Sequence, residues 1–163
     1  SIAIQIAKNA GANIIALTSS EEKIAKAKAL GADHCINYKD NTNWHKEIHS
    51  LTNGLGADII VDNVGEKTMQ NSLKSCKRGG KIITVGNTSG YNLQIDNRYI
   101  FANQISIIGS TMGSKKDFQS VMKEILNGKI HAEIDSIYPL SEGQKAYKKL
   151  KEMSHFGKIV LTP

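Results

Sequence analysis

The sequence predicts an α/β protein built on a doubly wound parallel sheet. Strand-like apolar runs alternate with helical patterns along all 163 residues, and no long linker interrupts them. Right-handed crossovers between parallel strands leave few other topologies for this alternation. The clearest strand lies in the stretch 56–65, where a short β-branched run is typical of a strand buried on both faces. Its carboxyl end would open into the crevice where such sheets bind ligands.

The other elements follow in order along the chain. A helix over 1–10 has Ile2 and Ile6 at helical spacing, and Gly11 ends it. Ser19 and Glu22 have the spacing of a capping box for the next helix. We expect strands at 13–18, 32–38, 81–86, 105–109, 134–138 and 158–161, and helices at 21–30, 43–52, 69–76, around Tyr99, from Ser114 to Gly128 and at 142–153. In the helix after Ser114, the expected inner residues are Phe118, Val121, Met122, Ile125 and Leu126.

The charge balance and the cysteines favour a cytoplasmic protein without nucleic acid. Twenty-one basic and 15 acidic residues give a net charge of +6, but the lysines are spread over most expected helices instead of forming one patch. Cys35 and Cys76 lack metal or redox spacing and are typical of reduced core residues. No window approaches a membrane span. His45 and His49 are four residues apart, but no third ligand is evident, so we expect a solvated pair and no metal.

Four stretches together are similar to a known family. They are Ala-Leu-Gly-Ala-Asp-His-Cys-Ile-Asn-Tyr (29–38), Gly-Ala-Asp-Ile-Ile-Val-Asp-Asn-Val-Gly (56–65), Gly-Gly-Lys-Ile-Ile-Thr-Val-Gly (79–86) and Gly-Lys-Ile-Val-Leu-Thr-Pro (157–163). In this order they resemble the cofactor domain of the medium-chain dehydrogenases/reductases, nearest to quinone oxidoreductases and alcohol-dehydrogenase-like enoyl reductases. The resemblance covers essentially the whole chain. It implies a Rossmann-like fold.

This resemblance implies that the chain is a fragment. It begins inside a helix, without a methionine, immediately after the place where the family carries its first strand and glycine-rich turn. We therefore expect 1–163 to be one nucleotide-binding domain, whose tail from about 134 packs back toward an absent catalytic domain. Any zinc ligands and the catalytic residues would lie in that domain, so we name none.

The residues at the end of the family's second strand, here the strand at 13–18, indicate a preference for NADP(H) over NAD(H). An acidic residue there would bind both adenine-ribose hydroxyls. This sequence has Thr18, Ser19 and Ser20 instead, with Lys23 one turn into the helix. Small hydroxyls and an ammonium suit a 2′-phosphate better than a carboxylate does. The alternative is that Ser19 only caps the helix and Lys23 is solvated.

Other cofactor contacts are implied by position in the resemblance. Tyr38 would approach the adenine, or else pack as an edge tyrosine. The start of the Ser1 helix would meet the phosphates. Asp62 has the alternative role of tying down its loop. Asn63, Val64 and Gly65 would lie below the nicotinamide ribose. The residues expected to line the nicotinamide side, or else to serve turn chemistry, are Gly86, Asn87, Thr88, Ser110 and Thr111.

The resemblance implies reversible hydride transfer between the nicotinamide and a carbonyl or activated alkene in a small-molecule substrate. Two alternatives stay open: a methyltransferase that uses S-adenosylmethionine, for which Asp62 and Asn63 are the only support, and a non-catalytic nucleotide-sensing domain. The apolar strand at 105–109 is expected at a sheet edge, where related enzymes commonly join, so we expect a homo-oligomer.

Overall fold

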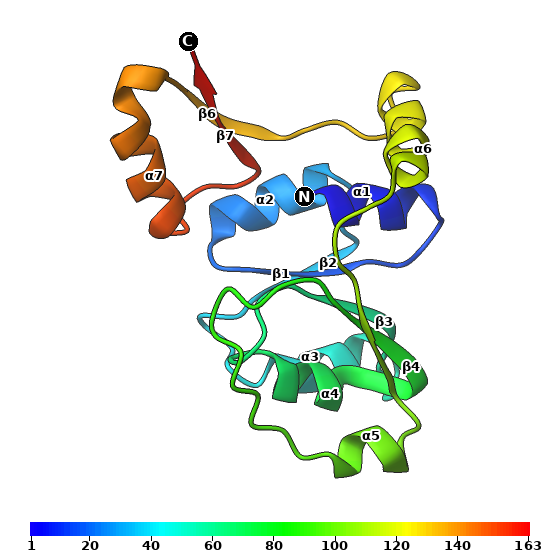
Figure 1. Ribbon diagram of the computed structural model, residues 1–163. Helices are drawn as coiled ribbons and strands as arrows, with labels where there is room; N and C mark the ends of the chain where they lie inside the picture. Colours follow the sequence, from blue (N-terminus) through cyan, green and yellow to red (C-terminus); the bar gives the residue numbers. More distant parts are fainter. The chain divides into compact units, whose positions relative to one another are not determined.

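The computed structural model describes residues 1–163, which divide into two compact units (Figure 1). Unit 1 contains Ser1–Asn37 and Lys115–Pro163, and unit 2 contains Tyr38–Ser114. Every strand pair in both units is parallel. The predicted α/β class with parallel strands is therefore confirmed. The strands form three sheets, of two, three and two strands, where the sequence predicted one.

The first sheet of unit 1 pairs β1 (Ile15–Thr18) with β2 (His34–Asn37). Two helices accompany it, α1 (Ile2–Asn9) and α2 (Glu21–Ala29), and Gly11 and Gly31 follow them in the positive-φ conformation expected after a helix. Its core consists of Ile14, Ala16, Ala27 and Ala32, with Ile4, Ala7, Cys35 and Phe156 packed against it. Phe156 comes from the far end of the chain, so the tail contributes to this core.

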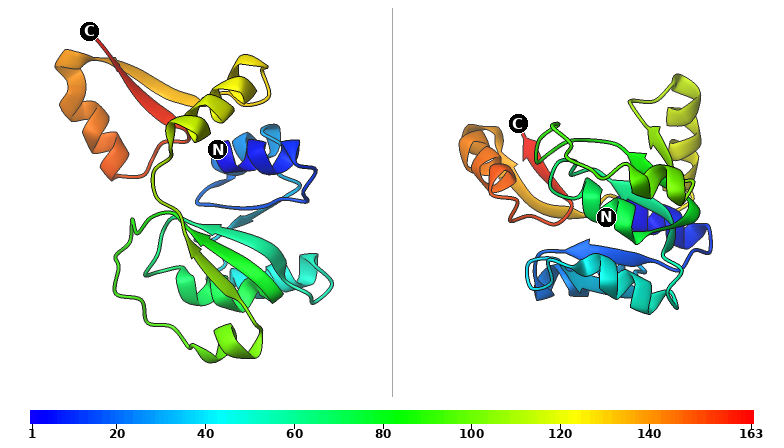
Figure 2. Two further views of the ribbon diagram at one scale, coloured as in Figure 1. Left: turned by 45° about the vertical axis from the view of Figure 1, so that its right-hand side comes forward. Right: turned by 90° about the horizontal axis from the view of Figure 1, so that it is seen from below.

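The tail forms the second sheet of unit 1. Strands β6 (Ile134–Pro139) and β7 (Lys158–Thr162) pair in parallel, and the 3-10 helix η1 (Leu140–Glu142) and α7 (Gly143–Lys151) connect them. Figure 2 shows α7 running beside this two-stranded ribbon. Helix α6 (Lys115–Leu126) precedes β6.

Unit 2 is a three-stranded sheet with helices on one face. Its order is β3 (Ala57–Asp62), β4 (Cys76–Thr84), β5 (Ser106–Gly109). Helices α3 (Trp44–Leu51) and α4 (Met69–Ser75) lie side by side in Figures 1 and 2, and α4 packs on β3 and β4. The short helix α5 (Arg98–Ala102) appears where one was expected around Tyr99. The core comprises Met69, Leu73, Cys76, Ile82 and Ile105.

Two expectations about burial are wrong. Strand β3 is not buried on both faces, because Ile59 is 63% exposed and Val61 52% exposed. It pairs only with β4, and the α4 side covers only the face that carries Ile60 and Ile82. Helix α6 buries none of its residues: Phe118 is 64% exposed and Leu126 79% exposed. The apolar stripe predicted the helix correctly, but no element of its unit packs extensively along that stripe.

The capping prediction for α2 is wrong by one residue. The N-cap is Ser20, with an extended backbone (φ −165°), and its Oγ accepts a hydrogen bond from the Lys23 backbone N–H at 3.3 Å. Ser19 therefore precedes the cap. Since a capping box also requires an acid three residues after the cap, and that position is Lys23, the structure has a simple serine cap.

Candidate functional site

In unit 2, the loops that follow β3 and β4 are hydrogen-bonded to each other at the carboxyl ends of these strands. The Val64 carbonyl accepts from Ser89 twice, from its backbone N–H at 2.9 Å and from its hydroxyl at 2.8 Å. The Glu66 N–H donates to the Gly90 carbonyl at 3.2 Å. The Thr88 hydroxyl donates to the Asn63 carbonyl at 3.3 Å. The structure thus brings together the predicted residues of these two loops: Asn63, Val64, Gly65, Gly86, Asn87 and Thr88.

Asp62, the last residue of β3, organises the first of these loops. Its side chain is buried, with 4% of the residue exposed. One carboxylate oxygen accepts from the backbone N–H groups of Val64 and Gly65, both at 3.0 Å. The hydroxyls of Thr68 (2.9 Å) and Ser72 (2.7 Å) donate to the other oxygen. All these donors lie within ten residues of Asp62, so the carboxylate ties down its own loop, as the alternative for Asp62 supposed.

Gly65 is required where these two loops meet. Its φ is +87°, a conformation that residues with a Cβ rarely adopt. A Cβ there would lie 2.6 Å from Asn87 Oδ1 and 2.9 Å from the Gly90 carbonyl oxygen. At Gly86, a Cβ would lie 3.3 Å from the Asn63 carbonyl oxygen. The loops therefore approach more closely than side chains would allow.

Ser110 and Thr111 extend this edge of the sheet, and Tyr38 lies elsewhere in unit 2. Ser110 follows β5, and its backbone N–H donates to the Thr84 carbonyl on β4 at 3.0 Å. Thr111 is the next residue, and both are exposed. Tyr38 begins unit 2 directly after β2 and is 43% exposed. Its exposed ring is not that of a core residue.

In unit 1, the carboxyl end of β1 leads into the amino terminus of α2. Thr18 is 7% exposed, and its hydroxyl has no hydrogen-bond partner. Buried hydroxyls without a partner are uncommon in folded proteins. Ser19 is half-buried, and Ser20 caps α2. Ser1 is exposed and begins α1 without a side-chain capping bond.

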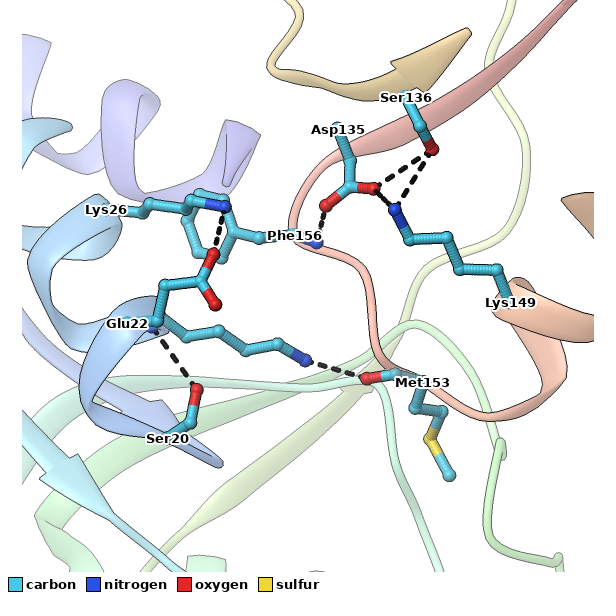
Figure 3. A network of polar contacts seen from close by, with 9 residues as sticks. Ser20, Glu22, Lys26, Asp135, Ser136, Lys149, Met153 and Phe156 are labelled. Atoms are coloured by element: carbon cyan, nitrogen blue, oxygen red, sulfur yellow. Dashed lines mark hydrogen bonds and ion pairs between the residues drawn. The ribbon is translucent and has the colours of Figure 1, made fainter. Parts of the chain in front are cut away.

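Lys23 is held by the tail of the chain. Its ammonium Nζ donates to the Met153 carbonyl at 2.7 Å, across 130 residues of sequence. Figure 3 shows Met153 facing the first turn of α2, where Glu22 forms an ion pair with Lys26 at 2.7 Å. The alternative of a simply solvated Lys23 is therefore wrong for this structure.

Several residues with structural roles at these sites were missed from the sequence. Thr68 and Ser72 are four residues apart on one helical face, a spacing that could have been paired with the acid that precedes them. Ser89 gave no comparable signal, because its partners are backbone groups on another loop. His49 was expected to be solvated, but its ring nitrogens lie 3.0 Å from the Gly54 carbonyl and 2.8 Å from the Lys74 carbonyl. That expectation is wrong, because the ring joins α3 to α4.

The titratable groups show no strong nucleophile. Burial, with a smaller effect of the Asp58 charge, raises the pKa of the Cys76 thiol to about 11. Burial also raises the pKa of Cys35 and lowers that of His45.

No three His, Cys, Asp or Glu side chains gather into a group that could hold a metal ion. The helices are all too short or too polar to cross a bilayer.

Comparison with known proteins gives consistent similarities. Residues 1–127 match the zinc-binding dehydrogenase family. A zinc-type alcohol dehydrogenase-like protein of Schizosaccharomyces pombe is 33% identical over 163 residues, which cover 98% of this chain and 47% of that protein. The chain thus spans about half the length of the curated relatives it matches.

Solved structures agree in fold over the same extent. The crystal structure of an NAD-dependent alcohol dehydrogenase has a TM-score of 0.93 and 39% identity, with coverage of 99% of this chain and 47% of that one. A 2-octenoyl-CoA carboxylase reductase in complex with NADP and 2-octenoyl-CoA has a TM-score of 0.88 and 28% identity, with coverage of 98% and 39%. The first of these two proteins is NAD-dependent, and the second was solved in complex with NADP.

Proposed function

Because the chain belongs to the zinc-binding dehydrogenase family of medium-chain dehydrogenases/reductases, we propose that it is the cofactor-binding part of an NADP(H)-dependent oxidoreductase. The reaction would be hydride transfer between the nicotinamide and a carbonyl or an activated alkene. The names of the similar proteins, alcohol dehydrogenase and enoyl-type reductase, support both substrate classes. The cofactor supplies the hydride, and these residues bind and orient it.

The observation that carries the choice of NADP(H) is the end of β1. Thr18, Ser19 and Ser20 stand where a carboxylate would favour the two free ribose hydroxyls of NAD(H). The unpartnered Thr18 hydroxyl fits a group that is to be satisfied by a ligand. The amino terminus of α2 adds a positive dipole end, which favours an anion.

The loops after β3 and β4 would receive the nicotinamide ribose. Their backbones are fixed by Asp62 and by the contacts between Val64 and Ser89. Gly65 and Gly86 keep side-chain atoms away from the surface of the loops. A rigid loop without side-chain bulk suits close approach of a ring, since ordering the loop then costs little on binding.

The geometry gives the methyltransferase alternative little support. That alternative needs an acid that presents its carboxylate to the ligand after an inner strand. Asp62 is buried and accepts hydrogen bonds from Val64, Gly65, Thr68 and Ser72. Its carboxylate is therefore committed to its own loop. A measurement of substrate turnover would distinguish an enzyme from a non-catalytic nucleotide-sensing domain. It requires the chain together with any sequence that precedes Ser1 in its gene.

The test is calorimetric titration of the protein, with any such preceding sequence included, with NADPH and with NADH. We expect tighter binding of NADPH. The variant S19D would place a carboxylate near the 2′-phosphate and should weaken NADPH by about tenfold or more while NADH changes little, because like charges repel. Thr18→Asp tests the same point, but Thr18 is buried and Ser19 only half-buried, so Ser19 is the safer position.

A second test variant is T18V, which keeps the shape of the side chain and removes only its hydroxyl. If that hydroxyl serves the cofactor, T18V weakens cofactor binding without loss of stability, since no protein partner is lost. Tighter binding of NADH by the unchanged protein would reject the NADP(H) preference. Absence of binding of either cofactor would reject the proposed function as a whole.

A further inference from the structure

The C-terminal end of α7 presents the backbone carbonyl of Met153 to α2. Met153 follows the C-cap Glu152 and has φ +52°, the left-handed conformation in which helices commonly end, although glycine is the usual residue there. Its N–H still bonds back to the Leu150 carbonyl at 3.1 Å. Its own carbonyl receives the Lys23 ammonium at 2.7 Å. A cation at this position also interacts favourably with the negative end of the helix dipole.

The loop Met153–Phe156 is anchored at its other end by Asp135 on β6. Asp135 accepts from the Phe156 backbone N–H at 2.9 Å. Its other oxygen pairs closely with the Lys149 ammonium and accepts from the Ser136 hydroxyl at 3.0 Å. Figure 3 shows Asp135 and Lys149 converging on the loop beside Phe156. The Asp135 side chain is 7% exposed and that of Lys149 is 28% exposed, so this anchor is a partly buried ion pair.

These contacts form a continuous connection from Asp135 to Lys23. Asp135 fixes Phe156, the end of α7 fixes Met153, and Met153 fixes the Lys23 ammonium. A lysine side chain is long and loses much rotamer freedom when it is ordered. The tail has already restricted the Lys23 side chain through this hydrogen bond. A ligand anion would therefore meet a cation whose position is already set.

We propose that Asp135 is a positioning residue for cofactor choice, which acts through the Met153–Phe156 loop on Lys23 and thereby on the 2′-phosphate of NADP(H). The inference rests on the proposed cofactor site at the end of β1. In this arrangement Lys23 is the specificity-determining cation, and the tail of the chain, more than 110 residues away in sequence, sets its place. The competing explanation is that Lys23 and Asp135 only stabilise the packing of α7.

The experiment measures dissociation constants of NADPH and NADH for the protein that includes any sequence before Ser1, and for its variants. K23Q should weaken NADPH by about tenfold or more, the scale of one charged contact, with NADH within about twofold. D135N keeps the size of the side chain but removes the charge that holds Lys149. We expect it to reduce the ratio of NADPH to NADH affinity by about threefold or more, since the Lys23 ammonium is then less restricted.

Two matched controls lie in the same unit. K26Q removes a neighbouring lysine of α2 whose ammonium pairs with Glu22 at 2.7 Å and not with the Met153 carbonyl. D33N removes a carboxylate that resembles Asp135 in its contacts, since it pairs with Lys8 at 3.3 Å and accepts from the Ile14 N–H at 2.8 Å. Both should leave the NADPH to NADH ratio unchanged. A merely structural role for Asp135 would make D135N behave like D33N.

The outcomes separate the two proposals. If the unchanged protein prefers NADPH and K23Q removes the preference, but D135N leaves the ratio unchanged, the positioning role is rejected and the proposed cofactor site stands. If D135N and D33N weaken both cofactors equally, the contact is structural and the positioning role is again rejected. If the unchanged protein shows no NADPH preference, the proposed cofactor choice itself fails. In the double variant K23Q/D135N we expect no further loss beyond K23Q, because both changes act on one ammonium.

Discussion

At the scale of single residues, Asp62 is the side chain on which the nicotinamide-side loop depends. Four donors converge on its buried carboxylate: two backbone N–H groups of the loop, the hydroxyl of Thr68 at the N-cap of α4, and the hydroxyl of Ser72 in α4. D62A would leave these donors without a partner in a site with little access to water. We expect the free energy of unfolding to fall by about 3 kcal/mol, because each unsatisfied buried group costs about 1–3 kcal/mol and part of the loop can relax. Urea unfolding of the protein and its variant measures this.

Asp58 on the same strand provides the control for D62A. It pairs with Lys77 at 2.7 Å, but its side chain is 77% exposed. D58A should therefore change stability by less than about 1 kcal/mol, as is usual for surface ion pairs. Equal losses for D58A and D62A would contradict the role assigned to Asp62.

Asp135 predicts a pH dependence of stability. Burial raises its pKa, but hydrogen bonds from Lys149, the Phe156 N–H and Ser136 outweigh this and lower the pKa from 3.8 to about 2. A depressed pKa in the folded state means that the stabilisation is present above pH 3.8 and is lost as the pH falls toward 2. Since one pKa unit corresponds to about 1.4 kcal/mol, the contribution at neutral pH is about 2 kcal/mol.

The measurement is urea unfolding of the unchanged protein and D135N between pH 6 and pH 2. The stability difference between them should be constant above about pH 5 and should shrink by about 2 kcal/mol at the acid end. A difference that stays the same across this range would show that the Asp135 carboxylate is not stabilised by its partners in the folded state.

At the scale of elements, local patterns predicted helices and strands well and burial poorly. The stripe of Phe118, Val121, Met122, Ile125 and Leu126 correctly indicated a helix, because side-chain spacing reflects the helical repeat. The same stripe could not show whether anything covers it. Strand β3 is a second example. Ile59 and Val61 favour a β-strand whether it is exposed or buried, so they predicted the strand but not its burial.

The N-terminus of α2 shows that a spacing pattern in the sequence can miss the N-cap by one residue. Ser19 and Ser20 are equivalent in type, and the acid at Glu22 favoured Ser19 by spacing. The backbone decided for Ser20, because the residue at the N-cap must be extended and its hydroxyl must reach the third N–H. The edge position expected for 105–109 agrees with the sheet of unit 2, where β5 pairs only with β4. A homo-oligomer through this edge stays a prediction.

At the scale of the whole molecule, every strand except β4 lies at a sheet edge, and β1 and β3 are two of them. Strand β1 pairs only with β2, and β3 pairs only with β4, so each has backbone groups that no strand satisfies. Because the chain spans about half the length of the relatives it matches, we propose that in a longer protein a further strand pairs with one of these edges. Residues 1–163 alone should then be less stable than the longer protein and bind NADPH more weakly, since unpaired backbone groups cost about 1–3 kcal/mol each where they are buried.

The comparison requires both forms, residues 1–163 and the same residues together with any further sequence that its gene encodes. Thermal unfolding should give a higher melting temperature for the longer form, and calorimetry should give a lower dissociation constant for NADPH. Equal melting temperatures together with equal affinities would show that the edges of β1 and β3 do not need a further strand.

The sequence by itself determined the family, the order of helices and strands and the parallel α/β class. These depend on short-range periodicity and on motifs such as 56–65 and 79–86, which can be read without knowledge of distant contacts. Only the tertiary structure decided that Lys23 meets the Met153 carbonyl, that Asp135 anchors the loop beside it, and that Ser89 joins the two loops at Val64. These contacts join residues that are 21 to 130 positions apart, and side-chain type alone does not say which distant partner a long or polar side chain will find. That choice is made when the sheets pack and each buried polar group must be satisfied.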